Sequence, residues 1–258
     1  MRLMKRILSA AAVLALSASL LVGCSSGTAS SVPVSASSAA ESTVSSVEET
    51  ASSAVDENEA AAAQLLNDLT GSYQELWPVI LADEYKQTWL DDCTALVGED
   101  NAEAAFEKLS SMVTGDVYGE DAVKAYANGG GAYFCGFTNS LAILTFDGET
   151  STISGTDKDG NVLFSHTYHY IGMEPVRGLY EFQSDDADSG EFTYFFLAPD
   201  TSAETYHIEF RYGSDAEALS QYDTGEYAYW LASGISTDCD QTMIDNCIEL
   251  FCNENLAG

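Results

Sequence analysis

Short runs of strand-forming residues follow one another between residues 132 and 212, and they restrict the possible folds more than any other feature of the sequence. Each run is rich in Tyr, Phe, Ile and Thr, and glycine and aspartate separate the runs. Asp147-Gly148 and Asp159-Gly160 supply the residues that tight hairpin turns require. Seven strands so closely spaced predict a meander that curls into a small barrel. The predicted strands span residues 132–137, 141–146, 151–154, 162–170, 179–183, 192–197 and 206–212.

Apolar residues at helical spacing precede the strands, between residues 57 and 113. They recur three and four positions apart, as on the buried face of a helix. Gly71 and Pro78 interrupt the pattern, so we expect several short helices instead of one long one. One of these is expected over residues 83–96, and the next begins near Asn101, whose side chain suits an N-cap. The recurring apolar residues are Leu65, Leu66, Leu69, Tyr73, Leu76, Trp77 and Ile80.

A last helix is expected over residues 240–251, and it carries or adjoins three of the cysteines. Cys247 and Cys252 lie five positions apart, so on a helix they point to different sides and are too far apart to bridge. Cys239 and Cys247 are separated by about two helical turns. Any disulfide should therefore run to Cys93 or Cys135, and at least one thiol stays unpaired. The sequence contains no Cys-x-x-Cys pair, so we expect no cysteine zinc knot.

The amino terminus has the pattern of an export signal. Basic residues at positions 2, 5 and 6 precede an apolar run over 7–22, and small residues end it. Leu21-Val22-Gly23-Cys24 resembles the lipobox of bacterial lipoproteins, which implies cleavage before Cys24 and acylation of its thiol. We expect residues 1–23 to be a lipoprotein signal peptide, with lipid alone holding the protein at the extracytoplasmic face of the cell membrane. The alternative is a plain signal peptide in which Cys24 occurs by chance.

Composition separates a tether from a folded domain. Residues 24–56 are rich in Ser and Ala and show no apolar period, so we expect a flexible tether. Residues 57–258 carry the aromatic residues and fit one globular domain. The formal net charge of −32 argues against nucleic acid and anionic membrane surfaces as ligands. Such a charge concentrates cations near the surface, but it does not define a binding site.

Candidate metal ligands lie in the predicted strand 206–212. Side chains alternate between the two faces of a strand, so His207, Glu209 and Arg211 share one face. An imidazole and a carboxylate two positions apart on one face can both reach a single cation. The same pattern also fits the polar face of a half-buried strand, in which Glu209 pairs with Arg211 or with a cross-strand partner. The spacing leaves both interpretations open.

Two further histidines lie in the predicted strand 162–170. His166 and His169 are separated by an odd number of positions, so in a regular strand they face opposite sides. At most one of them can join His207 unless a bulge intervenes. His169, between two tyrosines, fits either a ligand or an aromatic-layer residue whose ring nitrogen is already hydrogen-bonded.

Several loose motifs follow one another along the predicted domain. They are Gly71-Ser-Tyr-Gln-Glu-Leu-Trp-Pro78, Tyr168-His-Tyr-Ile-Gly172, Val176-Arg-Gly-Leu-Tyr-Glu-Phe182, Leu197-Ala-Pro199, His207-Ile-Glu-Phe-Arg-Tyr-Gly213 and Tyr227-Ala-Tyr-Trp-Leu231. In this order they resemble the ZinT/YodA family of periplasmic zinc- and cadmium-binding proteins, with the first motif similar to the family's opening helix. The resemblance implies an α+β, mainly β domain: a calycin-like (lipocalin-type) antiparallel barrel with an amino-terminal helical layer and a carboxyl-terminal helix. The same domain occurs at the carboxyl end of some zinc-uptake lipoproteins.

The resemblance implies a metal site centred on His207, where the family has the first histidine of a His-x-His pair. Glu209 stands in place of the second histidine. The family's third histidine falls near Phe195, whose side chain cannot bind a metal. His169 is a candidate third ligand, and His166 and carboxylates such as Glu181 are others.

We therefore expect an extracytoplasmic lipoprotein that binds zinc or a similar divalent cation for zinc homeostasis or uptake, with a metal importer as a possible partner. The alternative is a metal-free binding module of the same fold that uses the barrel mouth for a small molecule or a protein. We expect no enzyme, because the sequence has no Gly-x-Ser-x-Gly, no His-Glu-x-x-His and no phosphate-cradling loop.

Overall fold

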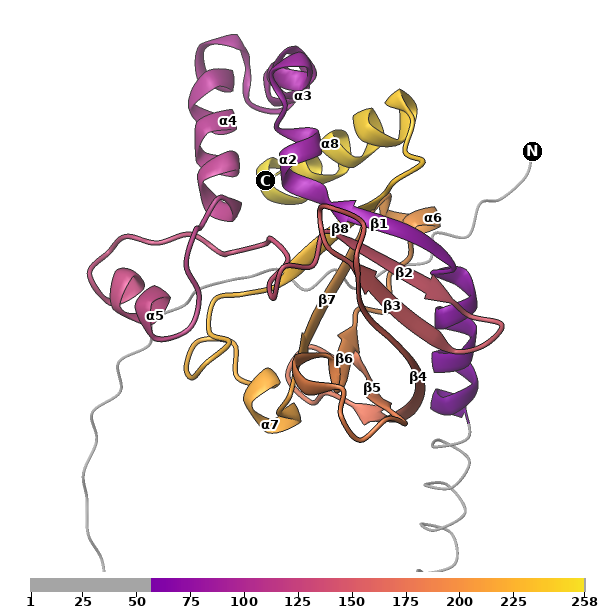
Figure 1. The fold of residues 1–258 in the computed structure, drawn as a ribbon. Helices are drawn as coiled ribbons and strands as arrows, with labels where there is room; N and C mark the ends of the chain where they lie inside the picture. The colour runs from indigo at the N-terminus through magenta and orange to yellow at the C-terminus, as the bar shows by residue number, and fades with distance from the viewer. Residues whose placement is uncertain (1–56, 258) are drawn as a thin grey trace, which may run out of the picture. The chain divides into compact units, whose positions relative to one another are not determined.

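Eight short strands close into an antiparallel barrel in the part of the chain that this computed structural model describes, residues 57–257 (Figure 1). Each strand pairs with its neighbours in sequence, and the first strand also pairs with the last, which closes the barrel. This confirms the predicted fold class. The strands are β1 (Gly71–Glu75), β2 (Ile143–Asp147), β3 (Thr152–Thr156), β4 (Val162–Met173), β5 (Tyr180–Ser184), β6 (Tyr194–Leu197), β7 (Ile208–Gly213) and β8 (Ala232–Ser236). The predicted signal peptide and tether, including Cys24, lie outside the described residues.

Helices precede the barrel, interrupt it and follow it. The carboxyl-terminal helix α8 packs against α2, α3 and α4, and α2 also contacts β8, so these helices form a layer against one side of the barrel (Figure 1). None of the helices between residues 57 and 257 is long and apolar enough to cross a membrane. The helices span residues 57–68, α2 (Leu76–Ile80), α3 (Lys86–Val97), α4 (Glu99–Val113), α5 (Glu120–Ala127), α6 (Ser202–Thr205), α7 (Ala216–Leu219) and α8 (Gln241–Leu256), with 3-10 turns η1 (Asp83–Tyr85) and η2 (Gly190–Phe192).

Aromatic side chains fill the barrel interior. They come from several strands and are almost fully buried in one continuous cluster. The rings of Phe195 and Tyr212 lie 5.3 Å apart, and those of Phe137 and Phe210 lie 5.2 Å apart. Packing of this kind occupies the space in which many antiparallel barrels hold a ligand.

Strand β1 corrects the prediction of helix through Tyr73. The structure places residues 71–75 in a strand, where Tyr73 pairs with Leu144 of β2 and with Ser236 of β8. Tyr73 is buried four positions after Leu69, as it would be on a helix that continued. The spacing of apolar residues alone therefore predicts a helix that is too long. Gly71, with a φ of 146°, lies at the change from helix to strand.

The segment 132–137 and strand β8 also differ from the prediction. Residues 132–137 form no strand; Phe134 makes only isolated bridges to Thr114 and Trp230. Strand β8 was not predicted, because its Ala-Ser-Gly-Ile-Ser sequence has weak strand propensity. It is buried on both faces, where small residues allow close packing.

The start of α4 is a smaller correction. The helix begins at Glu99, after Gly98, and Asn101 lies inside it. The Asn101 amide donates to the carbonyl oxygen of Val97 at 3.0 Å instead of capping the helix.

Candidate functional site

His207 lies at the entrance to β7. Helix α6 ends at Thr205, its C-cap Tyr206 turns the chain with a φ of 66°, and β7 begins one residue after His207. Tyr206 packs against the helical layer, not in the barrel interior as its place in the predicted strand implied. The following residues alternate as predicted: Ile208 and Phe210 are buried in the interior cluster, so Glu209 faces outward.

Hydrogen bonds to Thr205 hold the His207 ring. Its Nδ1 lies 2.7 Å from the Thr205 carbonyl oxygen. A carbonyl oxygen only accepts, so Nδ1 carries the hydrogen and Nε2 keeps its lone pair when the ring is neutral. The Thr205 hydroxyl also donates to the His207 carbonyl oxygen at 2.9 Å. A ring fixed in this way resembles metal-binding histidines, whose second nitrogen usually donates to a carbonyl or carboxylate.

An acidic residue of α8 lies near this histidine. Glu254, in the last turn of α8, lies close enough to His207, Glu209 and Asp200 for their charges to act on its carboxyl group. Partial burial raises the pKa of Glu254, the negative charges of Glu209 and Asp200 raise it further, and His207 opposes them. The arrangement brings acidic groups together that repel one another and that a cation would stabilise.

A sulfur atom completes the surroundings of His207. The Cys247 Sγ lies 3.9 Å from the His207 Nδ1. Burial raises the pKa of the Cys247 thiol to about 12, so it stays protonated near neutral pH. In the metal-free chain the thiol therefore packs beside the His207 ring as a neutral group.

His169 does not join His207 and Glu209. The strand register places His169 beside Gln183, then Tyr194, then Gly213, at the far end of β7 from His207. Its Nδ1 lies 2.6 Å from an Asp185 carboxylate oxygen.

His166 lies at the same end of the barrel as His169, and it pairs with the next aspartate. The His166 Nδ1 lies 2.6 Å from an Asp186 carboxylate oxygen. The two histidines face opposite sides of β4, as their spacing predicts: His166 is paired with Ile153 on the inner row, and His169 is exposed. Among residues 57–257, no group of three or more His, Cys, Asp or Glu side chains is already arranged to hold a metal ion.

Arg211 points away from the candidate ligands. Its side chain is fully buried and lies 4.4 Å from the centre of the Tyr222 ring. Burial lowers the pKa of Arg211 to about 10. The sequence left a pairing with Glu209 open, but the guanidinium donates instead to backbone carbonyls at the end of α7 and in the loop that follows it. These carbonyls belong to Leu219, Gln221 and Tyr227.

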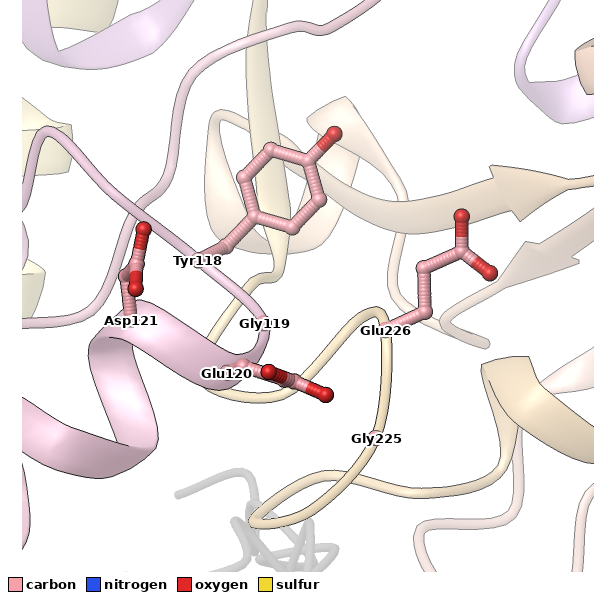
Figure 2. A pocket seen from close by; sticks show the side chains of 6 residues that line it. All are labelled: Tyr118, Gly119, Glu120, Asp121, Gly225 and Glu226. Carbon is pink, nitrogen blue, oxygen red and sulfur yellow. The ribbon is translucent and has the colours of Figure 1, made fainter.

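The surface pockets lie elsewhere. One, of about 460 Å³, opens where the start of α5 faces the loop at Gly225, with the carboxylates of Glu120, Asp121 and Glu226 around its rim and Tyr118 between them (Figure 2). Another, of about 330 Å³, is mainly apolar and is lined by residues of α2, the end of α4 and the segment 134–136. Neither pocket is lined by His207, Glu209 or His169.

No protein-family model matches this chain, and no curated protein matches its sequence. Similar solved structures include the Zn(II)-bound ZinT-like domain of Streptococcus pneumoniae AdcA, with 15% identity and a TM-score of 0.45 over 71% of this chain and 89% of that domain. The Zn(II)-bound AdcA from Streptococcus pneumoniae is similar at 14% identity and a TM-score of 0.42, over 70% of this chain and 34% of AdcA. The chain thus spans about a third of the full AdcA chain. At these values no residue role is transferred, and the barrel assignment rests on the strand pairing described above.

Proposed function

We propose that this protein is an extracytoplasmic, lipid-anchored lipoprotein that binds a divalent cation, zinc among others, in metal homeostasis or uptake. The observation that carries the proposal is the position of His207. Its Nδ1 is held by a backbone carbonyl, and its Nε2 is available as a ligand. The charges of His207, Glu209 and Asp200 all act on the carboxyl group of Glu254. The order of ZinT/YodA-like motifs along the sequence supports the same function.

Electrostatics favour a cation at this position. The charges of Glu209 and Asp200 make the ionised state of Glu254 less favourable, and the end of α8 adds the negative pole of its helix dipole. A bound divalent ion would offset both effects. Binding would also stabilise the folded chain, because the unfolded chain lacks the site.

The candidate ligands predict a lower zinc affinity than a site with three histidines has. They also predict a stronger relative preference for cations that favour oxygen ligands. Zinc sites in proteins usually have three or four protein ligands, with histidine and cysteine preferred. Here one imidazole is combined with carboxylate oxygens, which manganese and calcium accept as readily. Because no group of three ligands between residues 57 and 257 is already arranged, Glu209 and Glu254 must change rotamer to reach a shared ion. We therefore expect modest affinity and modest preference for zinc.

The test is a zinc titration by calorimetry, with a competing chelator, on the full chain carrying Cys24→Ala in mild detergent. We expect saturable one-to-one binding. His207→Ala should weaken it at least about tenfold, because the nitrogen ligand is lost. His169→Ala is the matched control and should bind like the parent, since His169 pairs with Asp185 at the other end of β7. Glu209→His should tighten zinc binding, because imidazole is a better zinc ligand than carboxylate.

Identical isotherms for the parent and His207→Ala would contradict the proposal. Zinc would then be held diffusely by the acidic surface. The apolar pocket of about 330 Å³ beside α2 favours a second candidate in that case, a metal-free module that binds a small apolar molecule there.

A further inference from the structure

Two buried cysteines meet in the helical layer. Cys93 belongs to α3 and Cys252 to α8, and their sulfur atoms lie 4.0 Å apart although the residues are 159 positions apart in sequence. Both side chains have no exposed surface, and both are free thiols in the structure. They lie in the cluster of buried side chains that joins α3 to α8.

The neighbours of the other cysteines make this pair distinct. The Cys135 sulfur contacts the carbonyl oxygen of Tyr133 at 3.9 Å, and the Cys247 sulfur contacts the His207 ring. Cys239 is only partly buried. Among the cysteines between residues 57 and 257, Cys93 and Cys252 are thus the two that the fold brings into mutual contact.

We propose that Cys93 and Cys252 form a disulfide that joins α3 to α8. A disulfide needs a sulfur–sulfur distance of about 2.0 Å. Helices α3 and α8 already pack against each other. Rotation of the two cysteine side chains therefore has to shorten only the sulfur–sulfur distance, from 4.0 Å to that of a bond. The inference is independent of metal binding.

The bond requires an oxidant, which we assign to a small-molecule disulfide such as oxidised glutathione. A deprotonated cysteine attacks one glutathione sulfur, breaks the glutathione S–S bond and releases one glutathione thiolate. The second cysteine thiolate then attacks the protein sulfur of the mixed disulfide and releases the other glutathione. Two protein thiols lose two electrons and two protons in total, and one oxidised glutathione becomes two reduced molecules.

The timing of the reaction follows from burial. Burial raises the pKa of both thiols in the folded chain, which suppresses the reactive thiolate, and it also excludes the oxidant. The bond should therefore form while the chain folds and resist reduction afterwards. It would tie the carboxyl-terminal helix to the layer that precedes the barrel and close a very long loop, the case in which a cross-link restricts the unfolded chain most.

The test is refolding of the full chain carrying Cys24→Ala in a glutathione redox buffer, followed by peptide mapping and by thiol counting after denaturation. We expect three reactive thiols out of five and one cross-linked peptide pair that contains Cys93 and Cys252. The Tm should fall by about 5 to 15 °C when a reductant is present during unfolding.

Variants separate the proposed bond from general effects of reductant. Cys93→Ala and Cys252→Ala should each leave four reactive thiols and lose the dependence of Tm on reductant. Cys239→Ala, the matched control at a partly exposed cysteine, should keep the cross-link and the dependence. Five reactive thiols in the refolded parent, or a cross-link that joins other cysteines, would overturn the proposal. Peptide mapping of the parent decides the question even if one variant fails to fold.

Discussion

At the scale of single residues, the hydrogen-bond partners of His207, Arg211 and His169 decide what each side chain can do. The Thr205 carbonyl makes Nδ1 of His207 a donor and leaves Nε2 free for a ligand. The carbonyls after α7 hold Arg211 in a buried position and remove its charge from the candidate site. His169 pairs with an aspartate in the following loop. These three residues have different partners that their positions in sequence do not reveal.

Replacement of Glu254 is predicted to raise the stability of the metal-free protein and to weaken its binding of a cation. Its pKa is raised in the folded chain, chiefly by burial, so the folded state keeps this proton at pH values where the unfolded state has lost it. Ionised Glu254 therefore destabilises the metal-free fold, fully above its folded pKa and not at all below the ordinary glutamate value. We expect Glu254→Gln to raise the Tm of metal-free protein at pH 7 by no more than about 2 °C, because Glu254 is only partly buried and solvent screens its charge.

The same substitution should weaken binding of a divalent cation, since it removes a carboxylate from the surroundings of His207. Thermal unfolding at several pH values, with chelator and with zinc, measures both effects. Glu249→Gln on the same helix is the control, and it should leave zinc binding unchanged. A fall in Tm for Glu254→Gln without metal, or unchanged zinc binding, would argue against a strained acidic site.

At the scale of elements, α8 connects the parts of the molecule. Its buried residues Ile244, Cys247 and Ile248 pack in the helical layer, and its last turn brings Glu254 to the entrance of β7. The helix starts at Asp240, whose carboxylate accepts a hydrogen bond from the Met243 backbone N–H at 2.9 Å. The orientation of α8 therefore affects both the core and the candidate site.

Removal of the α8 cap should have a measurable cost. Asp240→Ala leaves the Met243 N–H without its side-chain acceptor, which costs about 1 kcal/mol in helix caps. In a domain of this size the Tm should fall by roughly 2 to 4 °C. Urea unfolding followed by circular dichroism measures the change in the free energy of unfolding, and a thermal scan measures the change in Tm. Asp238→Ala, in the same turn, is the control, because Asp238 bonds to Ser236 through its backbone N–H. Equal effects of the two substitutions would show that Asp240 acts through charge and not through the cap.

At the scale of the whole molecule, the sequence has 41 acidic residues and only 9 basic ones. Such an excess attracts cations weakly everywhere on the surface, and salt screens the attraction over about 8 to 10 Å. Binding at a specific site is therefore distinguished from this diffuse attraction by single substitutions, which abolish the first and hardly change the second. The proposed lipid anchor would in addition hold the domain near the membrane, where a metal importer could receive the ion.

Lipid attachment is predicted to depend on Cys24. Cys24→Ala removes the thiol that the lipobox-like sequence marks for acylation. In a bacterial host the variant should lose fatty-acid labelling and leave the membrane fraction, because no acyl chain anchors it. Cys239→Ala should stay labelled and serves as the control. Fatty-acid labelling that persists in Cys24→Ala would show that another residue carries the acyl chain.

The sequence by itself determined the features that depend on neighbouring residues only, which are the tight turns, the alternation along a strand and the apolar face of a helix. The hairpins at Asp147-Gly148 and Asp159-Gly160 occur where the turn residues predict them. The alternation along β7 correctly separates the inward Ile208 and Phe210 from Glu209. The apolar face of α8 is likewise the buried one. In each case one segment of chain supplies both the pattern and the geometry.

Tertiary structure alone decided how the barrel closes and which polar groups meet. The contact of β1 with β8 joins residues more than 150 positions apart, and the Ala-Ser-Gly-Ile-Ser sequence of β8 gives no local signal. The approach of Glu254 to His207 depends on where α8 ends in space. Periodicity reports which side of a segment is buried, but it does not report the partner. Backbone hydrogen bonds between distant strands close the barrel, and side-chain packing between α8 and the other helices brings Glu254 near His207.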